Sequence, residues 1–305
     1  YDILEELQEY RRGLNYSSQT ERTFRNQAGF FIRFLEEKYC VETADRIRAE
    51  HLRRYQKHLN TLTGKKGLPM KPGSINNRIS AVHTLVEFMY RRGYVTTDLS
   101  RHISPVKTPK LLPAGVLTHS QVRKLIRSID TTCRRGYRDR AFIELLYSTG
   151  IRVGELVTLT LDNIDLENGT LKVFGKGKKE RTVPIGKTAL KWLTSYIRGI
   201  RPFQAGHDSY REVFLSKRGR PLSLSQIQAL VPYYGEKAGL DIRVTPHTFR
   251  RSCATEMIRG NANIYHVKDL LGHESIETLR PYTRLTITDI KKTHAECHPR
   301  EKDRS

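Results

Sequence analysis

Six residues from position 152 onward have side chains suited to chemistry on a phosphate ester. Guanidinium groups match phosphate oxygens, Lys and His side chains can transfer protons, and a tyrosine hydroxyl can act as a nucleophile. Each residue alone is more often structural, in a salt bridge, a polar turn, a helix end or a core. Their joint order in one strongly basic region sets them apart. They are Arg152, Lys176, His247, Arg250, His273 and Tyr282.

The segments around these six residues resemble the motifs of the tyrosine recombinase (phage integrase) family, and of Xer-type recombinases in particular. The resemblance covers nearly the whole chain and holds in order and roughly in spacing. It implies that the six residues occupy the family's catalytic positions. The chain departs from the family's pattern at Phe249, where Leu is commoner, at Arg251, where many members have a second histidine, and at Pro281. The matching motifs are TGIRVGEL, GKGKKER, HTFRRS, LLGHESIETLRPYT and the tail HPR.

The resemblance implies site-specific DNA recombination through a covalent 3′-phosphotyrosine. Tyr282 would attack the phosphodiester, while the two arginines and His273 hold the phosphate as it becomes five-coordinate. Lys176 would protonate the departing 5′ oxygen, and His247 would assist proton transfer or orient the phosphate-binding groups. Two strand exchanges would pass through a four-way Holliday junction. No cofactor and no metal are expected, and the sequence has no Walker loop and no carboxylate cluster of the two-metal type.

The charge of the chain favours a polyanionic partner. Its 305 residues carry 54 Lys and Arg against 32 Asp and Glu, a formal net charge of +22. Residues 101–250 hold 27 of the basic and 12 of the acidic residues, so the excess is concentrated there. Double-stranded DNA is therefore the expected partner. Weaker candidates for DNA contact are basic residues near loops, helix starts and a predicted hairpin: Lys65, Lys66, Lys71, Arg78, Lys178, Lys179 and Arg181.

Other classes of protein fit the sequence less well. No stretch is apolar enough to span a bilayer or resembles a basic amphipathic anchor, so no membrane partner is expected. The segment HAECH, residues 294–298, is not expected to bind a metal, because no second pair of ligands appears at suitable spacing. Four scattered cysteines without a CxxC pair indicate reduced thiols in a cytoplasmic protein: Cys40, Cys133, Cys253 and Cys297. A protein with DNA as its partner is expected to be nucleoid-associated.

The elements that must position the six residues divide the chain into two domains. Residues 1–103 have the apolar spacing of about four helices, and three prolines mark 104–116 as a linker. Residues 117–286 are expected to form the catalytic domain. The family resemblance further implies that 287–305 dock on a neighbouring subunit. The expected fold is mainly α with a small β-sheet: a helical, SAM-like core-binding domain and a mixed α/β catalytic domain, which form a C-shaped clamp on DNA.

Local patterns predict where the elements of both domains lie. Residues 169–185 alternate around a Gly-Lys-Gly turn and indicate a β-hairpin, with 212–223 as a weaker candidate. Arg152 is expected between two helices, and Thr245 is expected to cap the helix that carries His-x-x-Arg. Helices are expected at 119–130, 137–149, 187–199, 224–238, 246–259 and 264–271. The aromatic residues expected in the core of the first domain are Phe24, Phe30, Phe31, Tyr55 and Phe88.

Two alternatives to recombination stay open. A DNA-binding or architectural protein without catalysis would share the charge but would not need all six residues. A type IB-like relaxing enzyme would use the same nucleophile and rejoin the same strand. The family implies a homotetramer or mixed tetramer on two sites with inverted-repeat core sequences, in mobile-element integration and excision or in Xer-type dimer resolution. Pro281 would break or kink the short helix before Tyr282, which suggests a nucleophile that can swing.

Overall fold

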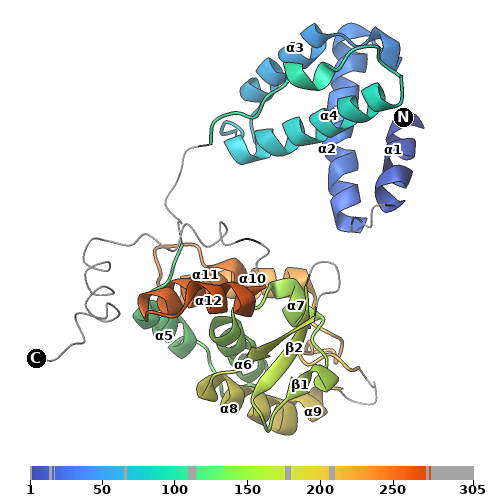
Figure 1. The fold of residues 1–305 in the computed structure, drawn as a ribbon. Coiled ribbons are helices and arrows are strands. Elements are labelled where there is room, and N and C mark those ends of the chain that lie inside the picture. The colour runs from blue at the N-terminus through green and yellow to red at the C-terminus, as the bar shows by residue number, and fades with distance from the viewer. Residues whose placement is uncertain are drawn as a thin grey trace, which may run out of the picture. The chain divides into compact units, whose positions relative to one another are not determined.

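The chain forms two compact units in a computed structural model (Figure 1). The structure describes residues 2–13, 16, 18–64, 67–108, 115–175, 180–205, 210–272 and 275. The units comprise residues 1–110 and 111–305, and each is described on its own. The division falls inside the segment 104–116 that the sequence marks as a linker.

The first unit is built from helices, as its apolar spacing predicts. Their apolar faces meet in a core that includes Phe31 and Tyr55, whose rings pack edge to face with centroids 4.9 Å apart. The α-helices are α1 (Asp2–Gly13), α2 (Ser18–Tyr39), α3 (Ala49–Thr61) and α4 (Pro72–Arg91), with short 3-10 helices at Ala44–Arg46 and Leu99–His102.

One aromatic residue of this unit lies outside the core, so the expectation for it was wrong. Phe30 is 38% exposed, whereas the other four predicted core aromatics are buried. Phe30 and Phe31 are neighbours on α2 and point about 100° apart around the helix, so the burial of Phe31 does not require the burial of Phe30. The guanidinium carbons of Arg78 and Arg33 lie 4.1 and 4.9 Å from the centroid of the Phe30 ring. The ring and the two cations therefore share one surface of the first unit.

The second unit is also mostly helical, and its longer helices lie close to their predicted positions. The helix expected at 187–199 continues through a π-helical turn at Tyr196–Ile200 into α9, which the sequence did not predict. No described helix has the length and apolar character needed to cross a membrane. The helices are α5 (His119–Arg127), α6 (Arg134–Thr149), α7 (Val153–Val157), α8 (Lys187–Ser195), α9 (Arg201–Ala205), α10 (Leu224–Lys237), α11 (Pro246–Arg259) and α12 (Ile264–Leu271), with a 3-10 turn at Leu161–Asn163.

A three-stranded antiparallel sheet contains the predicted hairpin. Leu171 pairs with Val183, and Val173 pairs with Arg181, so the buried valines and leucine alternate with outward residues. The weaker hairpin candidate, 212–223, forms isolated bridges rather than strands. The strands are β1 (Ile164–Asp165), β2 (Thr170–Phe174) and β3 (Glu180–Pro184), in the order β1-β2-β3.

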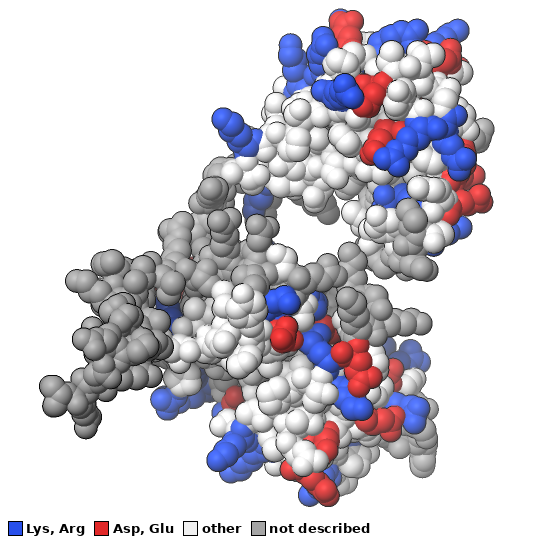
Figure 2. Space-filling model, in the orientation of Figure 1, with Lys and Arg blue, Asp and Glu red and all other residues white. Residues whose placement is uncertain are grey.

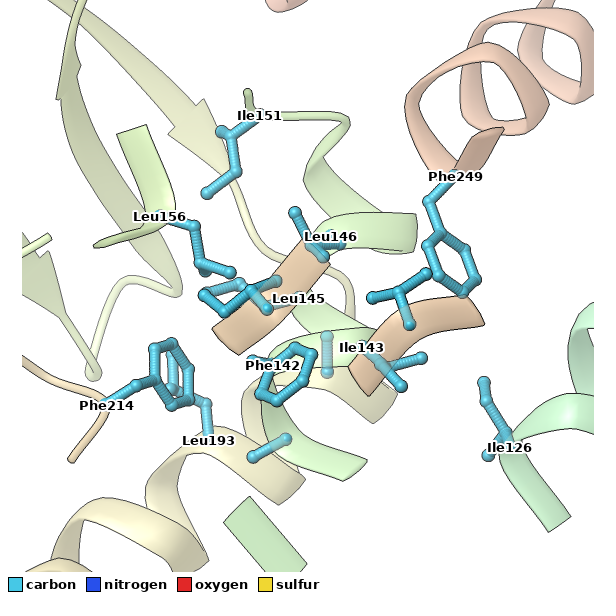
Figure 3. Close-up of a cluster of buried hydrophobic side chains, with 14 of the residues drawn as sticks. Ile126, Phe142, Ile143, Leu145, Leu146, Ile151, Leu156, Leu193, Phe214 and Phe249 are labelled. Carbon is cyan, nitrogen blue, oxygen red and sulfur yellow. The ribbon is translucent and has the colours of Figure 1, made fainter. Parts of the chain in front are cut away.

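Helix α6 lies at the centre of the core of the second unit. Phe142, Ile143, Leu145 and Leu146 are all 0% exposed, and four such residues within five positions mean that the helix is covered on several sides. Figure 3 shows these side chains with Phe249 of α11 among the residues around them. Because close-packed interiors resist displacement, the C-terminal end of α6 is a rigid base for the residues that follow it.

Candidate active site

Arg152 lies where α6 ends and α7 begins, as the sequence predicts. Gly150 ends α6 in the left-handed conformation, with φ 61°, which glycine adopts without steric cost. A Cβ at Gly150 would lie 2.5 Å from Leu271 Cδ2, so the end of α6 packs closely against the end of α12. Arg152 follows with an extended backbone as the residue that caps α7. The junction of the two helices therefore brings Arg152 to α12.

The His-x-x-Arg motif occupies the first turn of α11, and its two side chains have different surroundings. Thr245 caps the helix by accepting a backbone N–H at 3.3 Å, and Pro246 takes the first helical position, as predicted. His247 is exposed, whereas Arg250 is buried. Arg250 Nη1 donates to the carbonyl oxygen of Gly150 at 2.7 Å, which holds the guanidinium against the end of α6.

Three arginines bind three consecutive carbonyl oxygens at the end of α12, those of residues 270–272. Arg181 Nε donates to the first at 3.0 Å, Arg250 Nη2 to the second at 2.6 Å and Arg152 Nη2 to the third at 2.9 Å. The last carbonyls of a helix lack partners within it and lie at the negative end of its dipole, so cations are favoured there. The end of α12 thus brings together arginines from α7, α11 and β3.

A buried carboxylate holds two of these arginines. Glu155, whose side chain is 5% exposed, accepts from Arg152 N at 2.8 Å and from Arg152 Nη1 at 3.0 Å. It also accepts from both terminal nitrogens of Arg181, at 2.9 and 2.8 Å. Burial tends to raise the pKa of Glu155, but the hydrogen bonds from Arg181 and Arg152 outweigh it, and the pKa is lowered. Glu155 is therefore an ionised anchor for the two guanidinium groups.

Sequence reasoning missed Glu155, although a signal for it exists. Glu155 stands three residues after Arg152, the spacing of a helix capping box, in which a Glu side chain returns to the backbone N–H of the capping residue. The pattern gives the backbone contact. It gives no sign that the same carboxylate binds Arg181, which lies 26 residues further along the chain.

The imidazole ring of His247 has a lowered pKa, which favours its neutral form near pH 7. Loss of solvation against its surroundings is the largest cause that lowers the pKa of its ring, and the positive charges of Arg251, Arg250 and Arg152 lower it further. A neutral imidazole can accept a proton, which an imidazolium cannot. The exposed His247 is therefore available as a proton acceptor near three arginines.

Cys253, a described thiol beside this site, is unsuited to nucleophilic attack. Cys253 lies on α11 with its Sγ 3.4 Å from where a Cβ of Gly150 would be, and burial raises its pKa to about 11. The nucleophilic form of cysteine is the thiolate, which is scarce at that pKa. Cys40, Cys133 and Cys253 are free thiols in the part of the chain that the structure describes.

Three of the six predicted catalytic residues, Lys176, His273 and Tyr282, lie outside the described residues, as do Pro281 and the HAECH segment. The structure thus places Arg152, His247 and Arg250, and brings the two arginines together. His273 follows Gly272 directly, so the chain leads to it from the end of α12.

The candidates for DNA contact have different surroundings. Lys71 is exposed directly before α4, and Arg78 is half-buried beside Phe30. Arg181 is turned inward to Glu155, and its side chain is 14% exposed. Figure 2 shows Lys and Arg side chains interspersed with Asp and Glu on one face, so the positive excess does not gather into a single patch there. The other four candidates, Lys65, Lys66, Lys178 and Lys179, lie outside the described residues.

Comparison with known proteins gives relatives over most of the chain. A model of the phage integrase family matches residues 115–288, which include all six predicted catalytic residues. Tyrosine recombinase XerD of Staphylococcus epidermidis is 37% identical over 227 residues, which cover 74% of this chain and 77% of that relative. Tyrosine recombinase XerD of Staphylococcus aureus strain Mu50 is 38% identical over the same length and the same shares.

Solved structures share the fold over almost the whole chain. XerH site-specific recombinase bound to palindromic difH substrate gives a TM-score of 0.75 at 21% identity, with 96% of this chain and 83% of that chain covered. Tn1549 transposon integrase in complex with a circular intermediate DNA gives a TM-score of 0.75 at 17% identity, with 97% and 98% covered. The chain therefore belongs to the phage integrase family and is a tyrosine site-specific recombinase of the Xer type.

Proposed function

We propose that this recombinase cuts DNA by in-line attack of Tyr282 on a phosphodiester. The bond between the tyrosine oxygen and phosphorus forms as the bond to the 5′ oxygen breaks, which gives a 3′-phosphotyrosine and a free 5′-hydroxyl. The proton that leaves the tyrosine is balanced by the one that the 5′ oxygen gains. A 5′-hydroxyl from the partner duplex then attacks the phosphotyrosine and restores a DNA bond. Two such exchanges, through a Holliday junction, recombine two sites.

The convergence of Arg152 and Arg250 is the observation that supports this proposal most strongly. They come from α7 and α11, yet they bind adjacent carbonyl oxygens at the end of α12, and this convergence supports a role for both on one phosphate. Two guanidinium groups can stabilise the charge that develops on the non-bridging oxygens during attack. The chain continues from that helix end to His273 and, nine residues later, to Tyr282.

Proton transfer is assigned to His247 and Lys176. His247 has a lowered pKa and is proposed to accept or relay the proton of the attacking tyrosine. Lys176 is proposed to protonate the 5′ oxygen as it leaves. The paired residues Phe174 and Glu180 flank the segment that contains Lys176, so the ends of that segment are fixed by the β2–β3 ladder.

The proposed partner is duplex DNA with inverted-repeat core sites. Relatives with the same fold have been solved in complexes with DNA. On the first unit we assign contacts to Lys71 and Arg78. We further propose a homotetramer or mixed tetramer on two sites, with residues 287–305 docking on a neighbouring subunit, and a cytoplasmic, nucleoid-associated location. Its role is then mobile-element integration and excision or Xer-type dimer resolution.

A plasmid that carries two recombination sites tests the proposal. The sites are first recovered from genomic DNA by covalent capture on the protein. The proposal predicts deletion or inversion products with the wild type and none with Tyr282→Phe. Relaxed plasmid without exchanged products would instead indicate a type IB-like activity, and binding with neither outcome would indicate an architectural protein.

A further inference from the structure

We propose that Arg181 is a positioning residue of the active site rather than a DNA contact. It orients Arg152 through Glu155, and it fixes the end of α12, from which the chain continues to His273. The inference rests on the proposed function and adds to it a residue that touches neither DNA nor the reacting atoms. Arg181 lies on β3, so one side chain connects the sheet, α7 and α12.

The pairing of Arg181 with Glu155 fixes the plane of the carboxylate. Arg181 Nη1 lies 2.9 Å from Glu155 Oε1, and Nη2 lies 2.8 Å from Oε2, a two-point contact between planar groups. The side chains are 14% and 5% exposed, so water screens the pair less than it screens a surface pair. Arg152 Nη1 binds the same Oε1 at 3.0 Å. The plane that Arg181 fixes therefore sets the direction of the Arg152 guanidinium.

Arg181 also holds the last turn of α12. Its Nε donates to the carbonyl oxygen of Leu270 at 3.0 Å. A Cβ at Gly272 would lie 3.0 Å from Arg181 Cζ, so the guanidinium packs directly against the Gly272 backbone. Arg152 binds the carbonyl oxygen of the same Gly272. The two arginines thus hold one turn of chain at carbonyl oxygens two residues apart, immediately before His273.

The backbone of Arg181 is itself held in the sheet. Arg181 pairs with Val173 of β2, and Val173 is buried in the core of the second unit. The Arg181 side chain begins on a paired strand, and its guanidinium makes three hydrogen bonds to protein atoms. It therefore has little freedom to turn toward DNA. All three of its nitrogens bind protein atoms. The geometry therefore supports a positioning role for Arg181. A residue that does not touch the substrate, but whose own bonds are fixed, can hold a catalytic group to within a fraction of an ångström.

The test separates DNA affinity from cleavage. Arg181→Gln and Arg181→Lys are compared with the wild type for DNA dissociation constant over a range of salt, and for covalent cleavage of a nicked suicide substrate at saturating DNA. We expect Arg181→Gln to cleave roughly a hundred-fold more slowly, since small misplacement of a catalytic group has effects of that order. Its affinity and salt dependence should match the wild type. Arg181→Lys keeps the charge but not the planar fork, and its rate should lie between the two.

A matched control separates positioning from general destabilisation. Arg140 of α6 pairs with Glu144 at 3.2 Å, with side chains 20% and 9% exposed, in the same unit. Arg140→Gln removes another partly buried ion pair of this unit, one with a single contact, and should leave the saturating cleavage rate unchanged. In a double-mutant cycle, Arg181→Gln combined with Glu155→Gln should slow cleavage little more than either change alone, because both break one linkage.

Each other outcome overturns the inference. Weaker binding with a salt slope reduced by about one and a normal saturating rate would identify Arg181 as a phosphate contact. If Arg181→Gln cleaves at the wild-type rate and binds DNA with wild-type affinity, Arg181 has no positioning role. If Arg181→Gln does not fold, Arg181→Lys decides, because a wild-type rate for it would show that the fork is not needed. Failure of the proposed function is distinct, since the wild type would then form no covalent adduct.

Discussion

Arg152 and Arg250 bind the carbonyl oxygens of two successive residues, Gly272 at 2.9 Å and Leu271 at 2.6 Å. Two guanidinium groups held this close repel each other. The buried carboxylate of Glu155 and the negative end of the α12 dipole offset that repulsion. In the proposed reaction, a phosphate beside them would meet positive charge that is already arranged, which favours the five-coordinate state of the phosphorus.

Glu155→Gln should lower both stability and cleavage. An amide keeps one acceptor oxygen but no charge, so two arginines lose their counterion. We expect a loss of roughly 3 kcal/mol in the free energy of unfolding at neutral pH, at the low end for a broken buried pair because the Arg152 side chain is 39% exposed. Urea unfolding measures it, and equal midpoints for the two proteins would contradict the role of Glu155.

The stability difference between Glu155→Gln and the wild type should depend on pH. Burial raises the pKa of Glu155, but the bonds from Arg181 and Arg152 lower it more, to below the ordinary value of 4.5. The contribution of the carboxylate is therefore complete above pH 4.5 and is lost as the pH falls through the folded-state pKa. The urea midpoints of the two proteins should converge in that acid range. A gap that stays constant there would show that Glu155 does not act as a charge.

Gly272→Ala should impair cleavage beyond its effect on stability. Gly272 has φ 64°, and its new methyl group would meet the Arg181 guanidinium at 3.0 Å. Gly93 has φ 76° with no atom within 4 Å of its Cβ position, so Gly93→Ala carries the backbone strain without the collision. Each variant should lose roughly 1–2 kcal/mol of stability. The rate of covalent cleavage on a suicide substrate should fall only in Gly272→Ala. Equal rates for the two variants would show that the packing of Arg181 against Gly272 does not matter for cleavage.

His247 should give cleavage an acid limb. Loss of solvation and three nearby arginines lower the pKa of its ring below 6.5, so the ring is neutral at pH 7 and becomes charged only in more acidic solution. A proton acceptor works in its neutral form, so the cleavage rate should be flat near neutrality and fall as the pH drops through that pKa. His247→Gln should be slower throughout and lack this limb. A limb of the same shape in His247→Gln would assign it to another group.

Arg78→Gln should weaken DNA binding in a salt-dependent way. If Arg78 neutralises one phosphate, its loss should reduce the slope of log affinity against log salt by about one. Arg91 lies on the same helix, is 68% exposed and pairs with Glu87, so Arg91→Gln removes the same charge elsewhere on α4. Titrations at several salt concentrations compare the two. Equal slopes would remove Arg78 from the DNA contacts.

Local patterns were enough to predict most elements of the fold. Thr245 with Pro246 sets the start of α11, and a left-handed glycine ends α12 at Gly272, because caps depend on a few neighbouring residues. Phe30 was misplaced because its apolar character alone was taken to indicate burial, although Phe24 and Phe31, seven residues apart, lie on the buried face and Phe30 points about 100° away from Phe31. Short α9 was missed because five residues carry too little periodicity to be recognised.

The sequence predicts residue types for the site, but it predicts few of the contacts that the structure shows among them. The order of the motifs predicts Arg152, His247 and Arg250 as site residues, and the structure describes the contacts of these three. The inward turn of Arg181 depends on a carboxylate 26 residues before it and on carbonyl oxygens that the folded α12 presents. Such contacts arise from tertiary packing, and no spacing in the sequence encodes them. The position of Arg181 close to a lysine-rich hairpin predicts a DNA contact and gives no sign of its bonds to Glu155 and Leu270.

Mapping the residue to which DNA becomes covalently attached tests the proposed chemistry most directly. Wild-type protein is trapped on a nicked suicide substrate, digested with nuclease and trypsin, and analysed by mass spectrometry. The bond between Arg280 and Pro281 resists trypsin, so residues 269–284 should be released as one peptide that contains a single tyrosine, Tyr282. We predict that the nucleotide remnant maps to Tyr282 and that Tyr282→Phe forms no adduct. A remnant on any other residue, or an undiminished adduct with Tyr282→Phe, would contradict the proposed chemistry.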